Sequence, residues 1–258
     1  MLPTIPLLTP EQARKHADAG VDDGDLDRGV AQLGAQIRLQ LSEVARRRGP
    51  KSDHSECENE NEYPLSYGQQ GLWFLYNLAP ESTAYNLARA VKICATLDVA
   101  ALRCAFSKLI ARHAVLRTTF ATSRGYPIQR VAARVEPHFQ QEDARHWSEA
   151  QLDERLTEES ERPFNLARGP LLRINLFTRS SDEHILLLAA HHIIIDFWSL
   201  ALLIHELGPL YGAEQTGGRA ALPTLASSYA GSYSAFVRWQ RELLSSDKGE
   251  RHWEYWHS

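Results

Sequence analysis

The chain has 258 residues, of which 43% are hydrophobic and 23% are charged, and its formal net charge is −4 at pH 7. This composition is typical of a soluble globular protein and excludes disorder throughout the chain. The acidic balance and the scattered Lys and Arg residues give no basic surface, so nucleic acid is not an expected partner.

Cysteine usage bears on the compartment and on metal binding. Cys57, Cys94 and Cys104 are an odd number and show no CxxC spacing. The sequence therefore predicts neither a disulfide framework nor a zinc site. A reducing cytoplasm is the localisation that this pattern favours.

No segment predicts export or membrane insertion. The start of the chain, MLPTIPLLTPEQ, lacks the charged beginning and the uninterrupted apolar run of a signal peptide. The longest apolar stretch, residues 185–204, contains His191, His192 and Asp196 near its middle. Polar residues placed so centrally disfavour a bilayer span, and we expect a buried strand followed by a helix.

Residues 1–50 predict a separate helical segment. Apolar residues recur there at spacings of three and four and form one stripe along a helix: Leu26, Val30, Leu33, Ile37, Leu41 and Val44. The stripe either packs on its own domain or docks on a partner through residues 26–44. Residues 51–62, KSDHSECENENE, carry five acidic side chains and almost no apolar ones, which predicts a solvated linker and a domain boundary near Tyr63.

Helices and strands alternate from residue 63 to the end, without an internal repeat, which predicts a mixed α/β domain. The expected helices cover residues 67–78, with Ser66 as the cap, and residues 98–113, 147–161, 197–212, 227–245 and 248–256. The expected strands cover residues 85–97, 114–120, 126–131, 171–177 and 184–190, with a hairpin turn at SSDE between the last two.

The stretch LAAHHIIIDFWSL, residues 188–200, is the candidate site. Side chains alternate along a strand, so His192 shares a face with Leu188 while His191 points to the other face. One histidine can then act as a base in a cleft while the other is held by hydrogen bonds, and Asp196 can orient a ring or brace the turn. Adjacent strand residues converge poorly on a metal, so no metal is expected. That both histidines only satisfy hydrogen bonds in the core stays an alternative.

Four motifs resemble those of the condensation domains of non-ribosomal peptide synthetases, in the same order: SYGQQGLWFL (66–75), RHAVLRTTF (112–120), RPFNLARGPLLR (162–173) and HHIIIDFWS (191–199). SYSAFVRWQRE (232–242) resembles the next motif of that family. The resemblance covers roughly residues 63–256. It implies a chloramphenicol acetyltransferase-like fold, a mixed sheet with flanking helices, and it identifies residues 63–258 as the N-terminal lobe and the start of the crossover to a second lobe. The family's later motifs, including an arginine that pairs with Asp196, are expected beyond Ser258.

The resemblance also implies an activity, the formation of an amide bond between a carrier-bound acyl or peptidyl thioester and a carrier-bound amino acid. No cofactor is expected to bind directly, because the phosphopantetheine arms of donor and acceptor carrier proteins deliver the substrates. Residues 26–44 are then a docking segment for an upstream synthetase subunit. His192 is the expected catalytic residue, as base or as positioning hydrogen-bonder, and the expected supporting residues are His191, Asp196, Ser199, Arg112 and Arg117. His113 and Trp73 are expected to serve in packing.

This sequence departs from the family pattern at three positions. Ala190 stands where Met is common, Phe197 replaces the usual Gly of HHxxxDG, and Ala235 stands where Asp is frequent. The ring of Phe197 changes backbone freedom just after the candidate site. Other functions stay open: a stand-alone acyl-CoA acyltransferase, a non-catalytic docking fragment or remnant, and an epimerisation domain, which shares HHxxxD.

Overall fold

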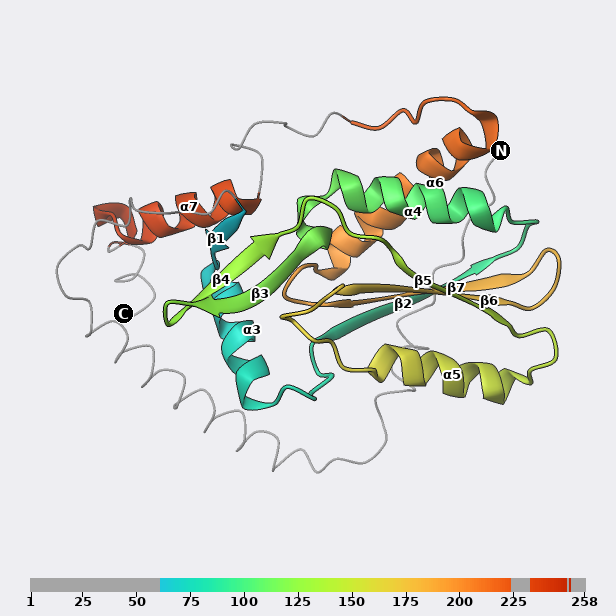
Figure 1. Cartoon of the computed structure of the whole chain (residues 1–258), viewed down its shortest axis with the longest axis horizontal. Coiled ribbons are helices and arrows are strands. Elements are labelled where there is room, and N and C mark those ends of the chain that lie inside the picture. The colour runs from blue at the N-terminus through green and yellow to red at the C-terminus, as the bar shows by residue number, and fades with distance from the viewer. Residues whose placement is uncertain (1–60, 224–232, 250, 252–258) are drawn as a thin grey trace. The chain divides into compact units, whose positions relative to one another are not determined.

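Two sheets organise the described residues, 61–223, 233–249 and 251, of this computed structural model (Figure 1). The larger sheet has the strand order β2 (Asn86–Ile93), β7 (His184–His191), β6 (Leu172–Thr178) and β5 (His138–Asp143). The smaller sheet has the order β1 (Glu62–Pro64), β4 (Tyr126–Val131) and β3 (Thr118–Ser123). Neighbouring strands are antiparallel except for β5 and β6, which are parallel.

Helices cover both faces of the larger sheet (Figure 1). On one face lie α4 (Val99–Arg112) and α6 (Phe197–Thr216), and on the other lies α5 (Glu149–Glu161). The remaining elements are α3 (Tyr67–Leu78), the 3-10 helix η1 (Ala114–Arg117) and α7 (Tyr233–Leu244).

The alternation of β6 and β7 builds a core on each face of the sheet. Leu186 and Leu188 of β7 belong to the larger core, together with residues of α4 and α6. Leu187 packs instead with Phe177 and with Leu152 of α5 in a second, smaller core. Because helices cover both faces of the sheet, the sequences of these strands are nearly continuous runs of apolar residues.

Side chains cap the helices that matter for the candidate site. Ser66 and Gln69 form a reciprocal capping box at the start of α3. Asp196 caps α6, whose other end is closed by Gly217 with a left-handed φ of 66°. These caps fix where the two helices begin and therefore where the preceding loops end.

Most of the expected elements are present, and the differences have physical causes. The expected strand 114–120 is wrong at its start, because Ala114–Arg117 forms a 3-10 helix and the strand begins at Thr118. Strand β5, with the sequence HFQQED, was not expected, because its polar residues give little alternation. Glu62, expected at the end of the linker, already pairs with Arg130 in the smaller sheet.

Residues 1–50, most of the expected linker and most of the expected helix 248–256 lie outside the described residues. The docking stripe at residues 26–44 therefore stays a prediction. Within the described residues, no helix combines the length and the apolar character that crossing a bilayer requires.

Candidate active site

A short loop between β7 and α6 carries the candidate site. The strand ends at His191 and the helix begins at Phe197, so HIIID spans the gap. The three isoleucines of the loop are 3–6% exposed and anchor it in the core, whereas His192 stays exposed. The buried isoleucines thus fix the loop, and the polar side chain of His192 stays at the surface.

His192 has a defined tautomer in its neutral form. Its backbone N–H donates to the carbonyl of Tyr85 at 2.8 Å, and its ring Nδ1 lies 2.8 Å from the carbonyl oxygen of Ile195. A carbonyl oxygen can only accept, so Nδ1 carries the proton. The lone pair of the neutral ring is therefore on Nε2.

His191 lies in the opposite environment. It is 3% exposed, and its Nδ1 accepts from the N–H of Ile193 at 3.1 Å, which places the ring proton on Nε2. Its ring and the ring of Phe164 are nearly perpendicular, at 86°, with 6.3 Å between ring centroids. Burial, with a smaller contribution from neighbouring His192, lowers the pKa of His191 to about 4. His191 is thus a neutral support at pH 7.

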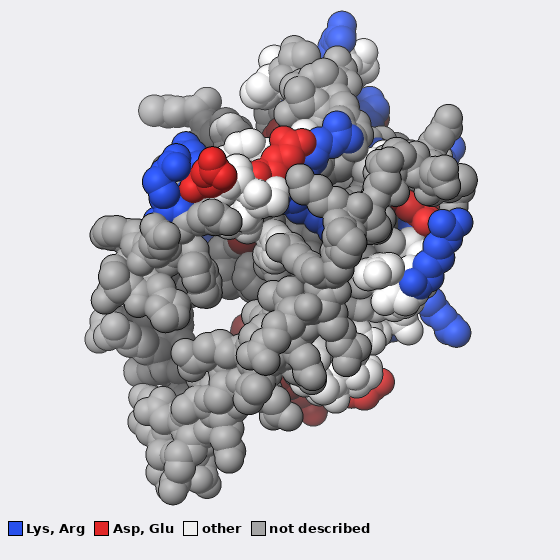
Figure 2. All heavy atoms as spheres, turned by 90° about the vertical axis from the view of Figure 1, so that its left-hand side faces the viewer, with Lys and Arg blue, Asp and Glu red and all other residues white. Residues whose placement is uncertain are grey.

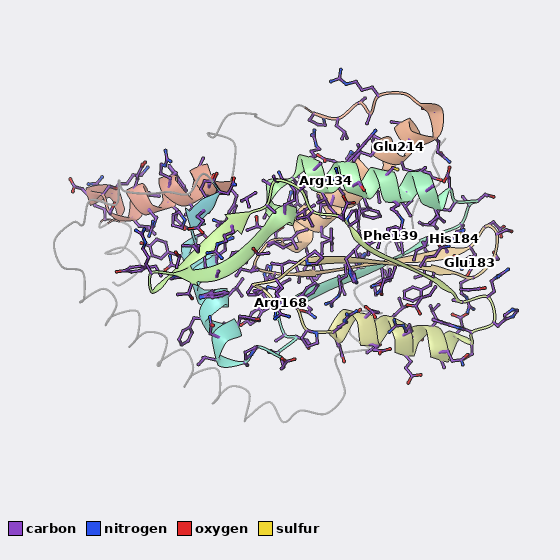
Figure 3. All side chains as sticks on the ribbon, in the orientation of Figure 1. Arg134, Phe139, Arg168, Glu183, His184 and Glu214 are labelled. Carbon is purple, nitrogen blue, oxygen red and sulfur yellow. The ribbon has the colours of Figure 1, made fainter. Side chains whose placement is uncertain are left out.

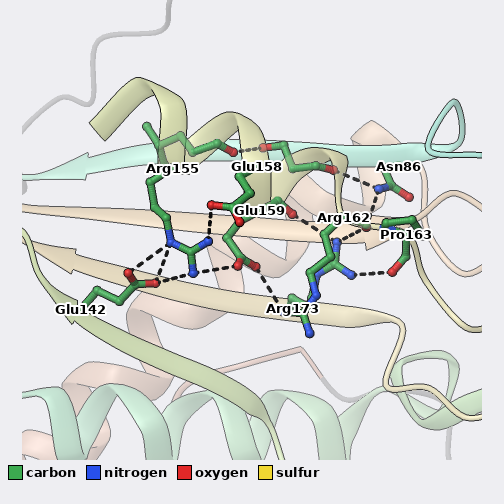
Figure 4. A network of polar contacts seen from close by, with 10 residues as sticks. Asn86, Glu142, Arg155, Glu158, Glu159, Arg162, Pro163 and Arg173 are labelled. Atoms are coloured by element: carbon green, nitrogen blue, oxygen red, sulfur yellow. Dashed lines mark hydrogen bonds and ion pairs between the residues drawn. The ribbon is translucent and has the colours of Figure 1, made fainter. Parts of the chain in front are cut away.

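A polar network lies between α5 and the sheet (Figure 4), and Phe164 connects it to His191. The guanidinium of Arg173, 5% exposed, lies 3.7 Å from the centre of the Phe164 ring and donates to the carbonyls of Glu159, Arg162 and Pro163. Burial lowers the pKa of Arg173 to about 10. Arg173 therefore holds the segment whose phenylalanine contacts His191.

Asp196 and Ser199 form the first turn of α6. The Asp196 carboxylate accepts from the N–H of Ser199 at 2.7 Å, and hydrogen bonds from the Ser199 side chain and backbone hold the pKa of Asp196 below its ordinary value. Asp196 thus braces the loop as a helix cap. The hydrogen bonds among the described residues do not show Asp196 orienting another side chain.

His192 borders a pocket of about 360 Å³. The wall is mostly apolar and carries a few polar groups, as small-molecule sites do. Its lining residues are His113, Val115, Leu116, His192, Ile193, Ile194, Ile195, Asp196, Ser199, Leu202, Leu203 and Tyr233. The pocket thus brings together His192, Asp196 and Ser199 of the expected site, and it adds His113 and Tyr233.

Arg112 and His113 of the RHAVLRTTF motif contact the same carboxylate on α6. Arg112 pairs with Glu206 of α6 (Nε to Oε2, 3.0 Å), and His113 Nε2 lies 2.7 Å from the same oxygen. His113, which was expected to serve in packing, therefore also makes a polar contact with Glu206. Glu206 was missed because it stands 93 residues beyond His113, and no local pattern reveals that contact.

Arg117 and Trp73 have structural surroundings. Arg117 donates to the carbonyls of Ile110 and Ala133, each at 3.2 Å, and to that of Ala132. It thereby ties η1 to the segment after β4. Trp73 packs against the larger core from its partly buried position, as expected.

Phe197, the residue that replaces the family's glycine, occupies the first position of α6. Its side chain is 63% exposed and does not belong to the pocket wall. The next residue, Trp198, is 75% exposed. The ring at position 197 therefore leaves the pocket of the described residues open.

Other polar side chains lie away from this pocket. Glu183 and His184 stand at the beginning of the hairpin strand β7, at the opposite end from His191 (Figure 3). Basic and acidic side chains lie beside one another on the described part of the face in Figure 2. The described residues contain no group of three or more His, Cys, Asp or Glu that could hold a metal ion.

Comparison with known proteins identifies the family. Residues 59–258 match the family model of the condensation domain. The chain belongs to this family, and the predicted family and mixed α/β fold are confirmed. The chain is 37% identical over 193 residues to the dimodular nonribosomal peptide synthase of Bacillus subtilis, in an alignment that covers 74% of this chain and 8% of that protein. It is 36% identical over 203 residues to the phosphinothricin tripeptide synthetase PhsC of Streptomyces viridochromogenes, covering 77% and 18%.

Solved structures show the same fold. The starter condensation domain of rhizomide synthetase superposes with a TM-score of 0.68 at 22% identity, covering 76% of this chain and 47% of that one. The X-domain in its complex with OxyB from teicoplanin biosynthesis gives a TM-score of 0.64 at 30% identity, covering 79% and 42%. The chain thus spans a small part of the two synthetases and less than half of each solved chain.

Proposed function

We propose that this chain forms the His192-bearing part of a condensation domain that makes amide bonds in non-ribosomal peptide synthesis. The single observation that carries the proposal is the hydrogen bond from His192 Nδ1 to the Ile195 carbonyl, which leaves the Nε2 lone pair for a group bound in the pocket. Membership in the condensation-domain family supports the reaction class.

The proposed reaction joins the amine of the acceptor amino acid to the acyl carbon of the donor thioester. The ammonium first loses a proton to solvent, and the free amine then attacks the carbonyl carbon, forming the C–N bond and moving the C=O π electrons onto oxygen. His192 Nε2 takes the second proton from nitrogen; where His192 only holds the amine by accepting from it, that proton passes to solvent. The C–S bond breaks as the carbonyl re-forms, and the departing sulfur takes up one proton, from His192 or from solvent, to give the donor thiol.

The surroundings of His192 suit this role. Three buried isoleucines and the neighbouring leucines keep the pocket wall apolar, which disfavours water as a competing nucleophile toward the thioester. His191, neutral and buried, fixes the loop from behind by accepting from Ile193. His191, Asp196, Arg112 and Arg117 are therefore proposed as supports, and Ser199 as a group at the pocket wall.

The partners follow from the same proposal. Phosphopantetheine arms of donor and acceptor carrier proteins bring both substrates, and residues 26–44 dock on an upstream synthetase subunit. We place the protein in the cytoplasm, which agrees with the free thiols of Cys94 and Cys104.

Amide formation between loaded donor and acceptor carriers tests the function, with this chain supplied together with the second lobe of a condensation domain. His192→Ala should lower the rate by about 10²–10⁴ without changing the thermal midpoint, because the side chain is exposed. His205→Ala, an exposed histidine on α6 outside the pocket wall, is the control.

The same assay separates the other functions. Equal turnover with free acyl-CoA and no carrier would favour the stand-alone acyltransferase. The docking fragment or remnant would be favoured by a wild-type chain that yields no amide with any second lobe. Turnover that needs both carriers and His192 supports the condensation reaction.

A further inference from the structure

The side chain of Gln69, in the first turn of α3, makes two hydrogen bonds to different parts of the chain. It is 3% exposed. Its Oε1 accepts from the N–H of Ser66 at 3.0 Å, which completes the capping box, and its Nε2 donates to the carbonyl of Ile193 at 3.2 Å. Gln69 therefore connects the start of α3 to the loop residue that follows His192.

A second capping box in this chain shows that the loop contact is not part of capping itself. At the start of α5, Gln151 Oε1 accepts from the N–H of Ser148 at 2.8 Å, and the Gln151 N–H donates to the Ser148 hydroxyl at 3.2 Å. This box has the same geometry as the first, but Gln151 is exposed at the surface. Burial and the bond to Ile193 are thus what distinguish Gln69.

The bond from Gln69 acts on the backbone that sets the tautomer of His192. The Ile193 carbonyl is held by Gln69, and the His192 N–H is held by the Tyr85 carbonyl. Two residues further on, the Ile195 carbonyl accepts from His192 Nδ1. A loop of five residues with both of these points fixed has few ways to turn the Ile195 carbonyl elsewhere.

Helix α7 joins the same contacts through Tyr233. Its hydroxyl lies 2.9 Å from the Ser66 hydroxyl, and Gln240 Oε1, on the same helix, accepts from the N–H of Tyr67 at 3.0 Å. Tyr233 also lines the pocket of His192. Helix α7 is thus bonded to the first turn of α3, where Gln69 originates.

We propose that Gln69 is a positioning residue of the His192 site and that Tyr233 couples the seating of α7 to it. The hydrogen-bonded chain runs from Tyr233 through Ser66 and Gln69 to Ile193. It holds the loop in the conformation in which the Ile195 carbonyl accepts from His192, so that the neutral ring keeps its lone pair on Nε2. Its catalytic meaning rests on the proposed function, whereas the geometry does not.

The test measures the ring nitrogens of His192 by ¹H–¹⁵N NMR in the full 258-residue chain, with the His192 signals assigned from their loss in His192→Gln. Wild-type His192 should show a protonated Nδ1 and an unprotonated Nε2. Gln69→Glu keeps an acceptor for Ser66 but places an oxygen against the Ile193 carbonyl, and it should shift both signals toward a mixture of tautomers. Gln151→Glu, the matched variant of the other box, should leave them unchanged.

A folded Gln69→Glu protein with the wild-type His192 signals would overturn the proposal. If Gln69→Glu does not fold, Tyr233→Phe decides, because it removes only a hydroxyl from a side chain that is 41% exposed. It should move the signals in the same direction by a smaller amount. The control is Tyr211→Phe, which removes a hydroxyl bonded to the N–H of Asp98. Unchanged signals in Tyr233→Phe would overturn the coupling to α7 and, where Gln69→Glu does not fold, the proposal as a whole.

Kinetics then distinguish this inference from the proposed function. In the amide assay, Gln69→Glu should lower kcat by about 10²-fold with KM nearly unchanged, because a misplaced base affects the transition state more than binding. NMR shifts in Gln69→Glu together with an inactive wild-type chain would refute the function and leave the positioning role standing. An active wild-type chain whose Gln69→Glu variant keeps both kcat and the His192 signals would refute the positioning role alone.

Discussion

At the end of β7, the two faces of the sheet differ in how their polar groups are paired. On the α5 side, charged groups are gathered and paired: Arg155 contacts Glu142 and Glu159, each at 2.9 Å, and Glu159 is 3% exposed. On the α6 side, the pocket is mostly apolar, and among the described residues only one ring nitrogen of His192 has a hydrogen-bond partner. The first arrangement pairs opposite charges with one another, and the second leaves a lone pair for a ligand.

The difference explains why only one of two neighbouring histidines is suited to chemistry. His191 faces the packed, paired side, and burial keeps it neutral with its Nδ1 engaged. His192 sits at the surface of the other side, one residue later, because the strand ends between them. Stability on one side and reactivity on the other should therefore respond to different substitutions.

The largest effect on stability is expected from Arg155→Met. Removing this guanidinium leaves the buried carboxylate of Glu159 with Arg162, 3.6 Å away, as its remaining ion-pair contact. Breaking a buried ion pair by removing one of its partners costs about 3–5 kcal/mol. Urea unfolding measures it, with Arg134→Met as the control, because Arg134 and Glu136 are 86% and 72% exposed. Equal stability of the two variants would contradict the distinction between paired interior and solvated surface.

The next effect is acid sensitivity from His191. The pKa of His191 is about 4 in the folded chain, below the ordinary 6.5. Between these pH values the unfolded chain binds a proton at this residue and the folded chain does not, so lowering the pH favours unfolding. Wild type should therefore lose up to about 3 kcal/mol from this group by the time the pH falls below the folded value. His191→Gln should flatten that loss between about pH 6.5 and about pH 4.

The control for His191 is His205→Gln on the exposed surface of α6. This variant should keep the acid slope of wild type. The prediction fails if His191→Gln unfolds with the same pH dependence as wild type.

Glu206→Gln should have an intermediate effect. The carboxylate contacts Arg112 and His113 and is 14% exposed, and a hydrogen bond to a charged group is worth about 1.5–3 kcal/mol. Hydrogen bonds from His113 and Arg112 outweigh burial and lower the pKa of Glu206. Its contribution is therefore present at neutral pH and disappears as the pH falls through the folded value.

Unfolding of wild type and Glu206→Gln should accordingly converge in acid. Glu214→Gln provides the matched change, since Glu214 also lies on α6 and pairs with Lys108 of α4, which is 57% exposed. We expect a smaller loss there at neutral pH. A constant difference between wild type and Glu206→Gln at every pH would refute the role of the charge.

The sequence predicted the elements with strong patterns and the residues that share a short motif. The apolar run before His191 predicted a strand, and the helical pattern after Ser66 predicted a helix that Ser66 caps; both are present. Strand β5 was missed because HFQQED is polar, although it pairs with β6 in the sheet. Contacts such as Glu206 with His113 and Gln69 with Ile193 join residues 93 and 124 positions apart, and only the tertiary packing brings them together.

The smallest effect is expected at Asp196. Its carboxylate caps α6 by accepting from the N–H of Ser199, and loss of such a cap costs about 1 kcal/mol. Asp196→Ala should therefore lower the free energy of unfolding by that amount, and Asp196→Asn, which keeps a capping oxygen, by much less. Asp98→Ala, which removes the equivalent cap of α4, sets the scale for a cap away from the pocket. If Asp196→Asn is as stable as wild type but makes amide bonds slowly, the charge of Asp196 acts on the reaction as well. The α6 side of the sheet then has a second polar group, besides His192, that acts on the reaction.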